Sequence, residues 1–214
     1  MQCGQSVRVG VIGRVVVLNG TTSAGKSTLI DLFCERRVAR GELWLRIALD
    51  DYMGKMPNEY FDLPGFEGRF GAEGFRVVER AGHIVFDVGP TAEHVLGAYR
   101  RTVATWARHG LDVIVDEVMF GSHAALDWTE ALAGLPVLWV AVRCSPEVAA
   151  QREIARGDRV IGLAAGQARM VYEHVHYGAE VDTTEATPEA CVAVLESAID
   201  SFTPFRHRGR STAP

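Results

Sequence analysis

The sequence is poor in the residues that would cross-link a fold or carry it into a membrane. Its longest apolar stretch is interrupted at Asn19 and Gly20, well short of the roughly 20 residues that cross a bilayer. The amino-terminal residues carry no recognisable cleavage signal, so we expect a cytoplasmic chain without a membrane partner. Its four cysteines form no CxxC pair, and we expect reduced thiols at Cys3, Cys34, Cys144 and Cys191.

An excess of positive charge is also missing. The formal net charge of -5 argues against bulk binding to nucleic acid, and it favours a small-molecule partner. Hydrophobic residues make up 48% and charged residues 23%, which is typical of a globular protein. We expect a single domain over residues 1–205, followed by a disordered tail at 206–214 that has no apolar periodicity. The oligomeric state is left open.

Apolar runs rich in β-branched residues alternate with helical patterns along most of the chain. This alternation predicts an α/β fold of three layers, with helices on both faces of a mostly parallel five-stranded sheet. Two helix starts are marked by a hydroxyl before proline, at Ser145 and Thr187. The predicted strands cover 14–18, 43–49, 112–118, 137–143 and 179–184. The predicted helices cover 26–40, 91–110, 122–134, 145–157, 164–175 and 187–200.

Residues 51–89 break this alternation with prolines and glycines. We interpret them as an inserted cap on the acceptor side, with a hairpin over 75–89 where two apolar runs flank a glycine-containing turn. The insertion is rich in aromatic residues. These aromatic residues either line an apolar acceptor pocket or simply pack the insertion onto the domain, and both explanations stay open. They are Tyr52, Tyr60, Phe61, Phe66, Phe70 and Phe75.

The segment "GTTSAGKS" at 20–27 fits the pattern GxxxxGK[ST] and lies between a predicted strand and a predicted helix. Such a loop wraps backbone N–H groups around phosphate, and the helix N-terminus adds its positive dipole. We expect Lys26 to neutralise the outer phosphates of ATP, and Ser27 to hold Mg²⁺. The nucleotide-binding residues are then Gly20, Thr21, Thr22, Ser23, Ala24, Gly25, Lys26, Ser27 and Thr28.

Phosphoryl transfer also needs a base and a metal ligand, and two strand ends supply acidic candidates. Asp50 follows an apolar strand at the sheet edge where ligands bind, although an aspartate there often only caps a turn, and Asp51 beside it is a decoy. Asp116 ends another strand and is our candidate for the magnesium side, with Glu117 a weaker one because alternation turns the two to opposite faces.

Positive charge for the moving phosphoryl group is available in "QREIARGDR". Guanidinium groups bind phosphate oxygens bidentately, so we interpret residues 152–166 as a lid that brings in Arg152, Arg156 and Arg159. Gly157 would end the helix and free that lid. The competing interpretation is a solvated basic face, and the phosphate-binding loop upstream favours the lid.

These motifs occur together in one known family. The segments "VLNGTTSAGKS", "IALDDYMGKMP", "VIVDEVMFG", "LWVAVRCSPEVAAQREIARGDRV" and "EVDTT" occur in the order found in chloramphenicol phosphotransferases, which the chain resembles over roughly residues 14–201. The resemblance implies an ATP-dependent kinase with a P-loop nucleotide-kinase fold that phosphorylates a hydroxyl of chloramphenicol. It implies Asp50 as the catalytic base, Lys26 and Ser27 as the phosphate and Mg²⁺ groups, and Arg152, Arg156 and Arg159 as the lid.

The likeness is weakest over 51–89, where the acceptor should bind. The acceptor is therefore chloramphenicol, another antibiotic or a hydroxylated metabolite. Two further hypotheses stay open. One is a nucleoside or nucleotide kinase, and the other is a nucleotide-binding regulator or toxin-like kinase that acts on a macromolecule.

Overall fold

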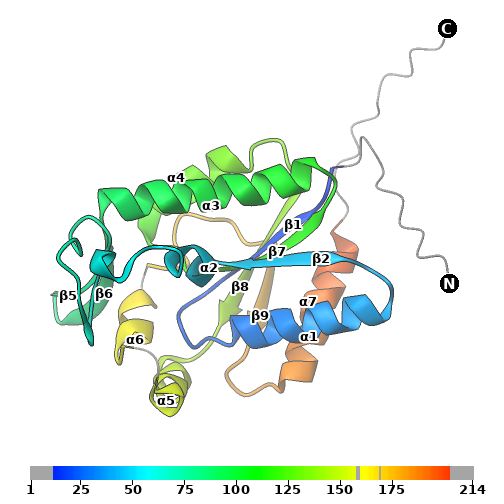
Figure 1. The fold of residues 1–214 in the computed structure, drawn as a ribbon. Coiled ribbons are helices and arrows are strands. Elements are labelled where there is room, and N and C mark those ends of the chain that lie inside the picture. Colours follow the sequence, from blue (N-terminus) through cyan, green and yellow to red (C-terminus); the bar gives the residue numbers. More distant parts are fainter. Residues whose placement is uncertain (1–11, 158–159, 169, 203–214) are drawn as a thin grey trace, which may run out of the picture.

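The computed structural model describes residues 12–157, 160–168 and 170–202. Its main sheet has five strands in the order β2-β7-β1-β8-β9, and each neighbouring pair is parallel (Figure 1). This confirms the predicted five-stranded α/β fold. The strands are β1 (Val15–Asn19), β2 (Trp44–Ala48), β7 (Asp112–Glu117), β8 (Val137–Arg143) and β9 (Ala179–Asp182).

Helices cover both faces of this sheet. They are α1 (Lys26–Ala39) and α7 (Pro188–Ser201) on one face, and α3 (Pro90–Arg108) and α4 (Gly121–Ala131) on the other (Figure 1). The predicted caps are present, since Ser145 Oγ accepts from Val148 N at the start of α5 (Pro146–Arg156), and Thr187 Oγ1 accepts from Ala190 N. Within the described residues no helix is long and apolar enough to cross a membrane.

The central strand shows why the apolar runs are continuous rather than alternating. Val15 and Val17 pack into the core beneath α3 and α4, whereas Val16 and Leu18 pack into the core beneath α1 and α7. All four side chains are fully buried. Each such side chain stabilises the fold by about 1.5–3 kcal/mol through removal of apolar surface from water. The sheet is thus held from both sides, and its carboxyl edge is fixed in place.

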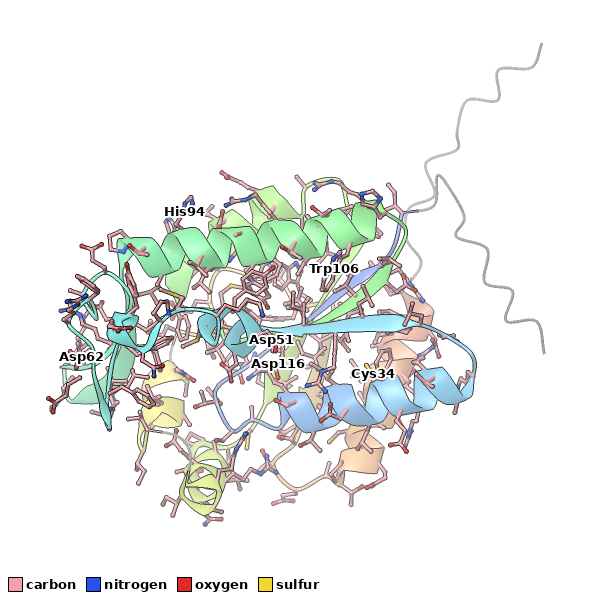
Figure 2. All side chains as sticks on the ribbon, viewed as in Figure 1. Cys34, Asp51, Asp62, His94, Trp106 and Asp116 are labelled. Carbon is pink, nitrogen blue, oxygen red and sulfur yellow. The ribbon has the colours of Figure 1, made fainter. Side chains whose placement is uncertain are left out.

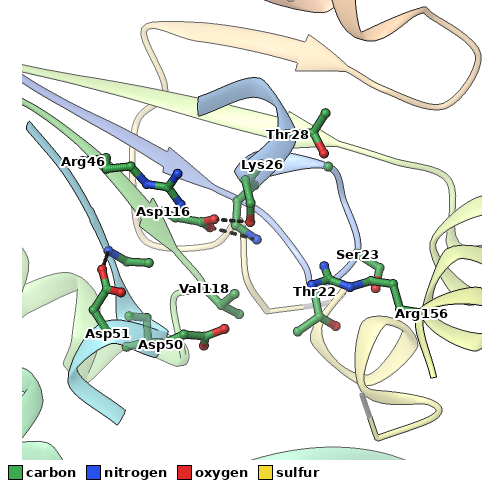
Figure 3. Close-up of a pocket in the computed structure, with 14 residues that line it drawn as sticks. Thr22, Ser23, Lys26, Thr28, Arg46, Asp50, Asp51, Asp116, Val118 and Arg156 are labelled. Carbon is green, nitrogen blue, oxygen red and sulfur yellow. Dashed lines mark hydrogen bonds and ion pairs between the residues drawn. The ribbon is translucent and has the colours of Figure 1, made fainter. Parts of the chain in front are cut away.

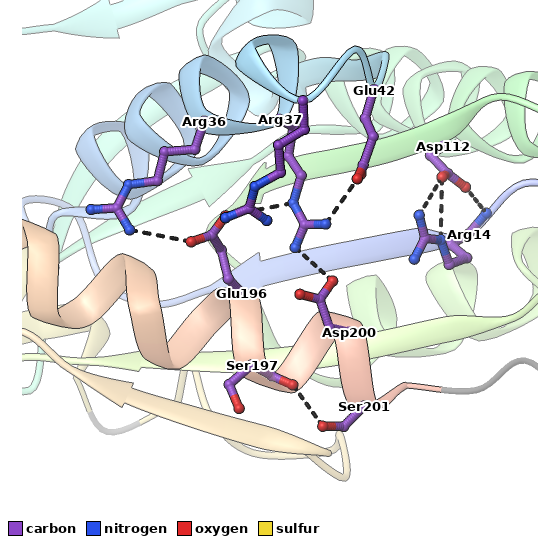
Figure 4. Close-up of polar contacts among 10 residues, drawn as sticks. Arg14, Arg36, Arg37, Glu42, Asp112, Glu196, Ser197, Asp200 and Ser201 are labelled. Atoms are coloured by element: carbon purple, nitrogen blue, oxygen red, sulfur yellow. Dashed lines mark hydrogen bonds and ion pairs between the residues drawn. The ribbon is translucent and has the colours of Figure 1, made fainter.

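A buried arginine ties the two helices of one face together. The Arg37 side chain on α1 is 3% exposed and pairs with Asp200 at 2.7 Å and with Glu196 at 3.7 Å, both on α7, and with Glu42 at 3.1 Å (Figure 4). Its neighbour Arg36 reaches Glu196 from a more exposed position. The guanidinium group therefore holds α1, which follows the phosphate-binding loop, against α7.

The inserted segment forms a second, four-stranded sheet in the order β4-β3-β5-β6. The predicted hairpin over 75–89 is confirmed, because β5 (Phe75–Arg80) and β6 (His83–Val88) pair antiparallel. Ala81 and Gly82 form the turn with φ of 52° and 76°, as a two-residue hairpin loop requires. The other elements are α2 (Leu49–Met53), a 3₁₀ turn (Asn58–Tyr60), β3 (Phe61–Leu63) and β4 (Phe66–Glu67).

Most of the inserted aromatic side chains pack against one another or against the main domain. Phe61 stacks on Phe75 with ring centroids 5.6 Å apart, and Tyr52 meets Tyr99 of α3 at 5.2 Å. Phe75 is fully buried, whereas Phe66 stays exposed. The packing explanation therefore holds for the inner members of the cluster.

The helix predicted over 164–175 is wrong beyond its first turns. The structure has only α6 (Leu163–Gln167), after which the chain continues in turns. The reason is tertiary, because Val171 O accepts from Asn19 Nδ2 at 2.6 Å and Tyr172 Oη donates to Val142 O. The first hydrogen bond occupies the Val171 carbonyl, which a longer helix would have used, and the second fixes the Tyr172 side chain on the main sheet. The expected tail at 206–214 lies outside the described residues.

Candidate active site

The loop between β1 and α1 has the shape that an anion site needs. Ser23 has a φ of 59° and Gly25 a φ of 90°, and successive residues in such conformations form the concave backbone turns that bind anions. Helix α1 begins at Lys26 without a side-chain cap and without an acidic residue in its first turn. Its first N–H groups and its dipole are therefore available to phosphate. Gly20 is required by space, since a Cβ there would lie 2.4 Å from Val142 O.

Lys26 lies across this loop rather than out in solvent. Its side chain is only 6% exposed, and Nζ donates to Gly20 O at 3.0 Å and to Thr21 O at 2.8 Å. A buried ammonium needs such partners. They hold the charge at the centre of the loop, where the outer phosphates of a nucleotide would lie.

The predicted metal-side residues meet at this point. Asp116 is the last residue but one of β7, which lies beside β1 in the sheet, and its Oδ2 accepts from Ser27 Oγ at 2.6 Å. Its Oδ1 lies 3.6 Å from Lys26 Nζ. The Ser27 hydroxyl and the Asp116 carboxylate thus lie close together near Lys26. Both are oxygen ligands of the kind that a hard cation such as Mg²⁺ prefers.

Glu117 points to the other side of the strand, as alternation predicts. It is buried, and its carboxylate accepts from Trp128 Nε1 at 2.8 Å and from Val118 N at 3.0 Å. Burial raises the pKa of Glu117 to about 7. The hydrogen bond with Trp128 holds α4 against β7. Glu117 therefore has a structural role and does not face Ser27.

The two adjacent aspartates have separate places. Asp51 Oδ2 accepts from Ala48 N at 2.7 Å, so this carboxylate caps the first turn of α2. Asp50 lines a cavity of about 290 Å³ together with Lys26, Ser27 and Asp116, and Asp51 lines it too, although its carboxylate is held by Ala48 N (Figure 3). We call it the phosphate-side cavity. In Figure 2, Asp51 lies on α2 just after β2 and Asp116 lies near the carboxyl end of β7, whereas Asp62 lies out in the inserted sheet.

The lid arginines are distributed over two cavities. Arg156 lines the phosphate-side cavity and also a second cavity of about 400 Å³. Arg152 lines only the second, and its guanidinium donates to Thr183 O at 2.7 Å and to Thr183 Oγ1 at 3.1 Å. Arg159 lies outside the described residues. The walls of the second cavity are mainly small or apolar, and include Leu29, Ala155, Ala186, Pro188 and Cys191.

Sequence reasoning missed three residues near this site. Arg46 of β2 lines the phosphate-side cavity. The sequence feature that could have indicated it is a single charged residue within an apolar strand. Glu153 is buried and accepts from Gly162 N at 2.6 Å and from Ala164 N at 3.1 Å, so it holds the start of α6. Gln167 of α6 accepts from the N–H of Thr22, which belongs to the phosphate-binding loop. No local pattern marks Glu153 or Gln167.

A comparison with known protein families identifies the family of this chain. The family model described as "Chloramphenicol phosphotransferase-like protein" matches residues 13–200. The chain belongs to this family. A protein of Mycobacterium tuberculosis (strain ATCC 25618 / H37Rv) named "Putative O-phosphotransferase" is 32% identical over 178 residues, which are 82% of this chain and 77% of that protein.

Solved structures with a similar fold include P-loop kinases. An APS kinase of Mycobacterium tuberculosis, in complex with AMPPNP and APS, superposes with a TM-score of 0.59 at 11% identity, covering 89% of this chain and 99% of that one. A gluconokinase from Sinorhizobium meliloti 1021 gives 0.56 at 15% identity, covering 89% and 93%. At these identities the likeness concerns the fold, and it agrees with the family in indicating a P-loop phosphotransferase.

Proposed function

We propose that this protein transfers the γ-phosphate of ATP to a hydroxyl group of a small molecule, with chloramphenicol as the first candidate acceptor. The observation that carries the proposal is one shared cavity, in which Asp50 faces the same space as Lys26 and the Ser27–Asp116 pair. A phosphate site and a carboxylate base at one sheet edge are the two parts that transfer to an alcohol needs.

Lys26 and the first N–H groups of α1 bind the outer phosphates. Ser27 Oγ and Asp116 would hold Mg²⁺, directly or through water, and the ion would offset the negative charge of the β and γ phosphates. Among the described residues no group of three or more His, Cys, Asp or Glu side chains could hold a metal by itself. That fits Mg²⁺, which keeps several waters and takes phosphate oxygens as ligands.

Asp50 orients the acceptor hydroxyl and takes its proton. As the hydroxyl oxygen bonds to the γ-phosphorus, the bond from that phosphorus to the bridging oxygen breaks, and its electron pair leaves with ADP. The proton goes to the Asp50 carboxylate. A neutral hydroxyl is a weak nucleophile, so a carboxylate within hydrogen-bonding reach contributes roughly 10²–10⁴-fold to the rate.

The lid supplies positive charge and a seat for the nucleoside. Arg156, which lines both cavities, acts on the transferred phosphoryl group. Arg152 supports the loop, since Thr183, which it contacts, also donates to Ala24 O at 2.8 Å. The apolar second cavity beside Gly25 takes the base and sugar of ATP. A phosphate-binding role for Arg159 stays a prediction.

Mass spectrometry of the acceptor tests the proposal. Chloramphenicol is incubated with the purified protein, ATP and Mg²⁺, and Lys26→Ala serves as the matched blank. We expect a phosphate-sized mass gain that depends on Lys26. A panel of nucleosides is assayed in parallel, and transfer to a nucleoside but not to chloramphenicol would replace the antibiotic acceptor by a nucleoside. The absence of transfer to every hydroxylated compound would refute the proposal.

A further inference from the structure

Glu153 of α5 is a buried acid whose carboxylate binds backbone groups of the next helix. The residue is 1% exposed, its Oε2 accepts from Gly162 N at 2.6 Å, and its Oε1 accepts from Ala164 N at 3.1 Å. Both donors lie at the start of α6, and the first N–H groups of a helix have no partner within it. Glu153 therefore caps α6 from another helix, with hydrogen bonds that its charge strengthens.

The main chain of the same residue ends α5. Gly157 N donates to the Glu153 carbonyl at 3.4 Å. Gly157 has a φ of 68°, so the chain leaves the helix in the left-handed conformation that is typical of a C-terminal cap. The carbonyl of Glu153 thus holds the beginning of the connection from α5 to α6, and its carboxylate holds the end. One residue fixes this connection on both sides.

Arg156 lies where this connection begins. It is the last residue of α5, and it lines both the phosphate-side cavity and the second cavity. In Figure 3 its side chain extends from α5 toward Ser23 of the phosphate-binding loop. The residue is exposed. The backbone at the end of α5 therefore decides which space the guanidinium group can reach.

The earlier part of α5 is anchored independently of the Glu153 carboxylate. Arg152 donates to Thr183 O at 2.7 Å, and Thr183 Oγ1 donates to Ala24 O of the phosphate-binding loop at 2.8 Å. Ala149, one turn before Glu153, is buried. Weakening the contacts of the carboxylate should therefore leave the body of α5 in place and loosen its carboxyl-terminal end, where Arg156 lies.

We propose that Glu153 is a positioning residue for phosphoryl transfer, which fixes the end of α5 so that Arg156 stays over the phosphate-side cavity. This rests on the proposed function, in which Arg156 acts on the transferred phosphoryl group. A positive group stabilises the transition state best when it is held in place before the reaction, because no reorganisation is then needed. Glu153 acts through Arg156 and touches no reacting atom.

A double-mutant cycle with Arg156 tests this role. Glu153→Gln has nearly the same shape, but its NH₂ group cannot accept, so one of the two backbone hydrogen bonds is lost. We expect kcat for phosphate transfer to fall about tenfold, the effect of one such hydrogen bond, while the KM for ATP stays near that of the wild type. In an Arg156→Ala background Glu153→Gln should cause no further loss, because the group that it positions is gone.

A merely structural role for Glu153 gives a different pattern. It would lower kcat by the same factor with and without Arg156, and that additivity would overturn the proposal. A wild-type kcat in Glu153→Gln would overturn it as well. Glu147→Gln, at an exposed position in the first turn of α5, is the matched control for loss of a carboxylate and should keep the wild-type kcat.

A second variant weakens the same contact from the side of α6. Gly162 has a φ of 95°, so Gly162→Ala strains the backbone whose N–H binds Glu153, and it serves in the cycle if Glu153→Gln does not fold. It should show the same loss of kcat and the same lack of additivity with Arg156→Ala.

Both cycles are also run on ATP hydrolysis without acceptor, in which water replaces the acceptor hydroxyl. Absence of transfer to every acceptor by the wild type would refute the proposed function. The hydrolysis rates would still show whether Glu153 acts through Arg156, and additive losses there would overturn the positioning role alone.

Discussion

Replacing Glu117 by glutamine should change how stability depends on pH. The carboxylate is buried beside Trp128 and Val118, which donate to it, and the Arg100 guanidinium nearby favours its charged form while Asp116 opposes it. Burial is the largest influence, and the pKa of Glu117 rises from 4.5 to about 7. The folded protein therefore keeps this proton over a pH range in which the unfolded chain has lost it.

The sign and the size follow from linkage. Below about pH 4.5 the carboxyl is protonated in both states, and its neutral form is fully compatible with burial. As the pH rises from 4.5 to about 7, only the unfolded chain releases the proton, so the folded state loses stability. A shift of about 2.5 pKa units corresponds to ~3 kcal/mol of unfolding free energy. The loss is complete above the folded pKa.

Urea unfolding at pH 4.5 and pH 8 measures this effect. We expect the wild type to lose ~3 kcal/mol relative to Glu117→Gln between the two pH values, because glutamine accepts a hydrogen bond but does not ionise. Glu59→Gln, at an exposed position, controls for the removal of one carboxyl group. If the wild type and Glu117→Gln keep the same difference at both pH values, the burial argument for Glu117 is wrong.

Three other substitutions have expected outcomes. Asp51→Ala should lower the unfolding free energy by about 1 kcal/mol through loss of the α2 cap and leave phosphate transfer near the wild-type rate; a large loss of transfer would contradict the separation of the two aspartates. Arg37→Ala should destabilise by about 1.5–3 kcal/mol in urea unfolding, against about 1 or less for the more exposed Arg36→Ala, and equal effects would refute the importance of the buried guanidinium group. Gly166→Ala should cost about 1–3 kcal/mol, because its Cβ would lie 1.9 Å from Ile84 O, and a fully stable variant would contradict this close packing.

Much of the fold and part of the site could be predicted because their signals are local. A buried parallel strand reads as a continuous apolar run, and the loop before Lys26 carries its own motif. Asp116 followed from the rule that the carboxyl ends of parallel strands share one edge, and the structure places it against Ser27.

The remaining features depend on contacts between distant segments. Gln167 is 145 residues from Thr22 in sequence, and no spacing within either segment indicates that they meet. After the early end of α6, Val171 and Tyr172 form hydrogen bonds with Asn19 and Val142, and periodicity cannot show such contacts. Asp50 and Asp51 could not be separated, because they are neighbours after the same strand and both line the cavity; only the hydrogen bond from Ala48 N to Asp51 distinguishes them.

The role of Asp50 as the base is tested by the rate of phosphate transfer by Asp50→Asn, measured together with ATP binding by calorimetry. We expect a loss of roughly 10²–10⁴-fold in transfer, because the base is gone, with ATP bound as tightly as by the wild type. Lys26→Ala provides the contrast, since it should lose nucleotide affinity as well. Transfer by Asp50→Asn at the wild-type rate would contradict the assignment of Asp50 as the base and, with it, the proposed chemistry of the phosphate-side cavity.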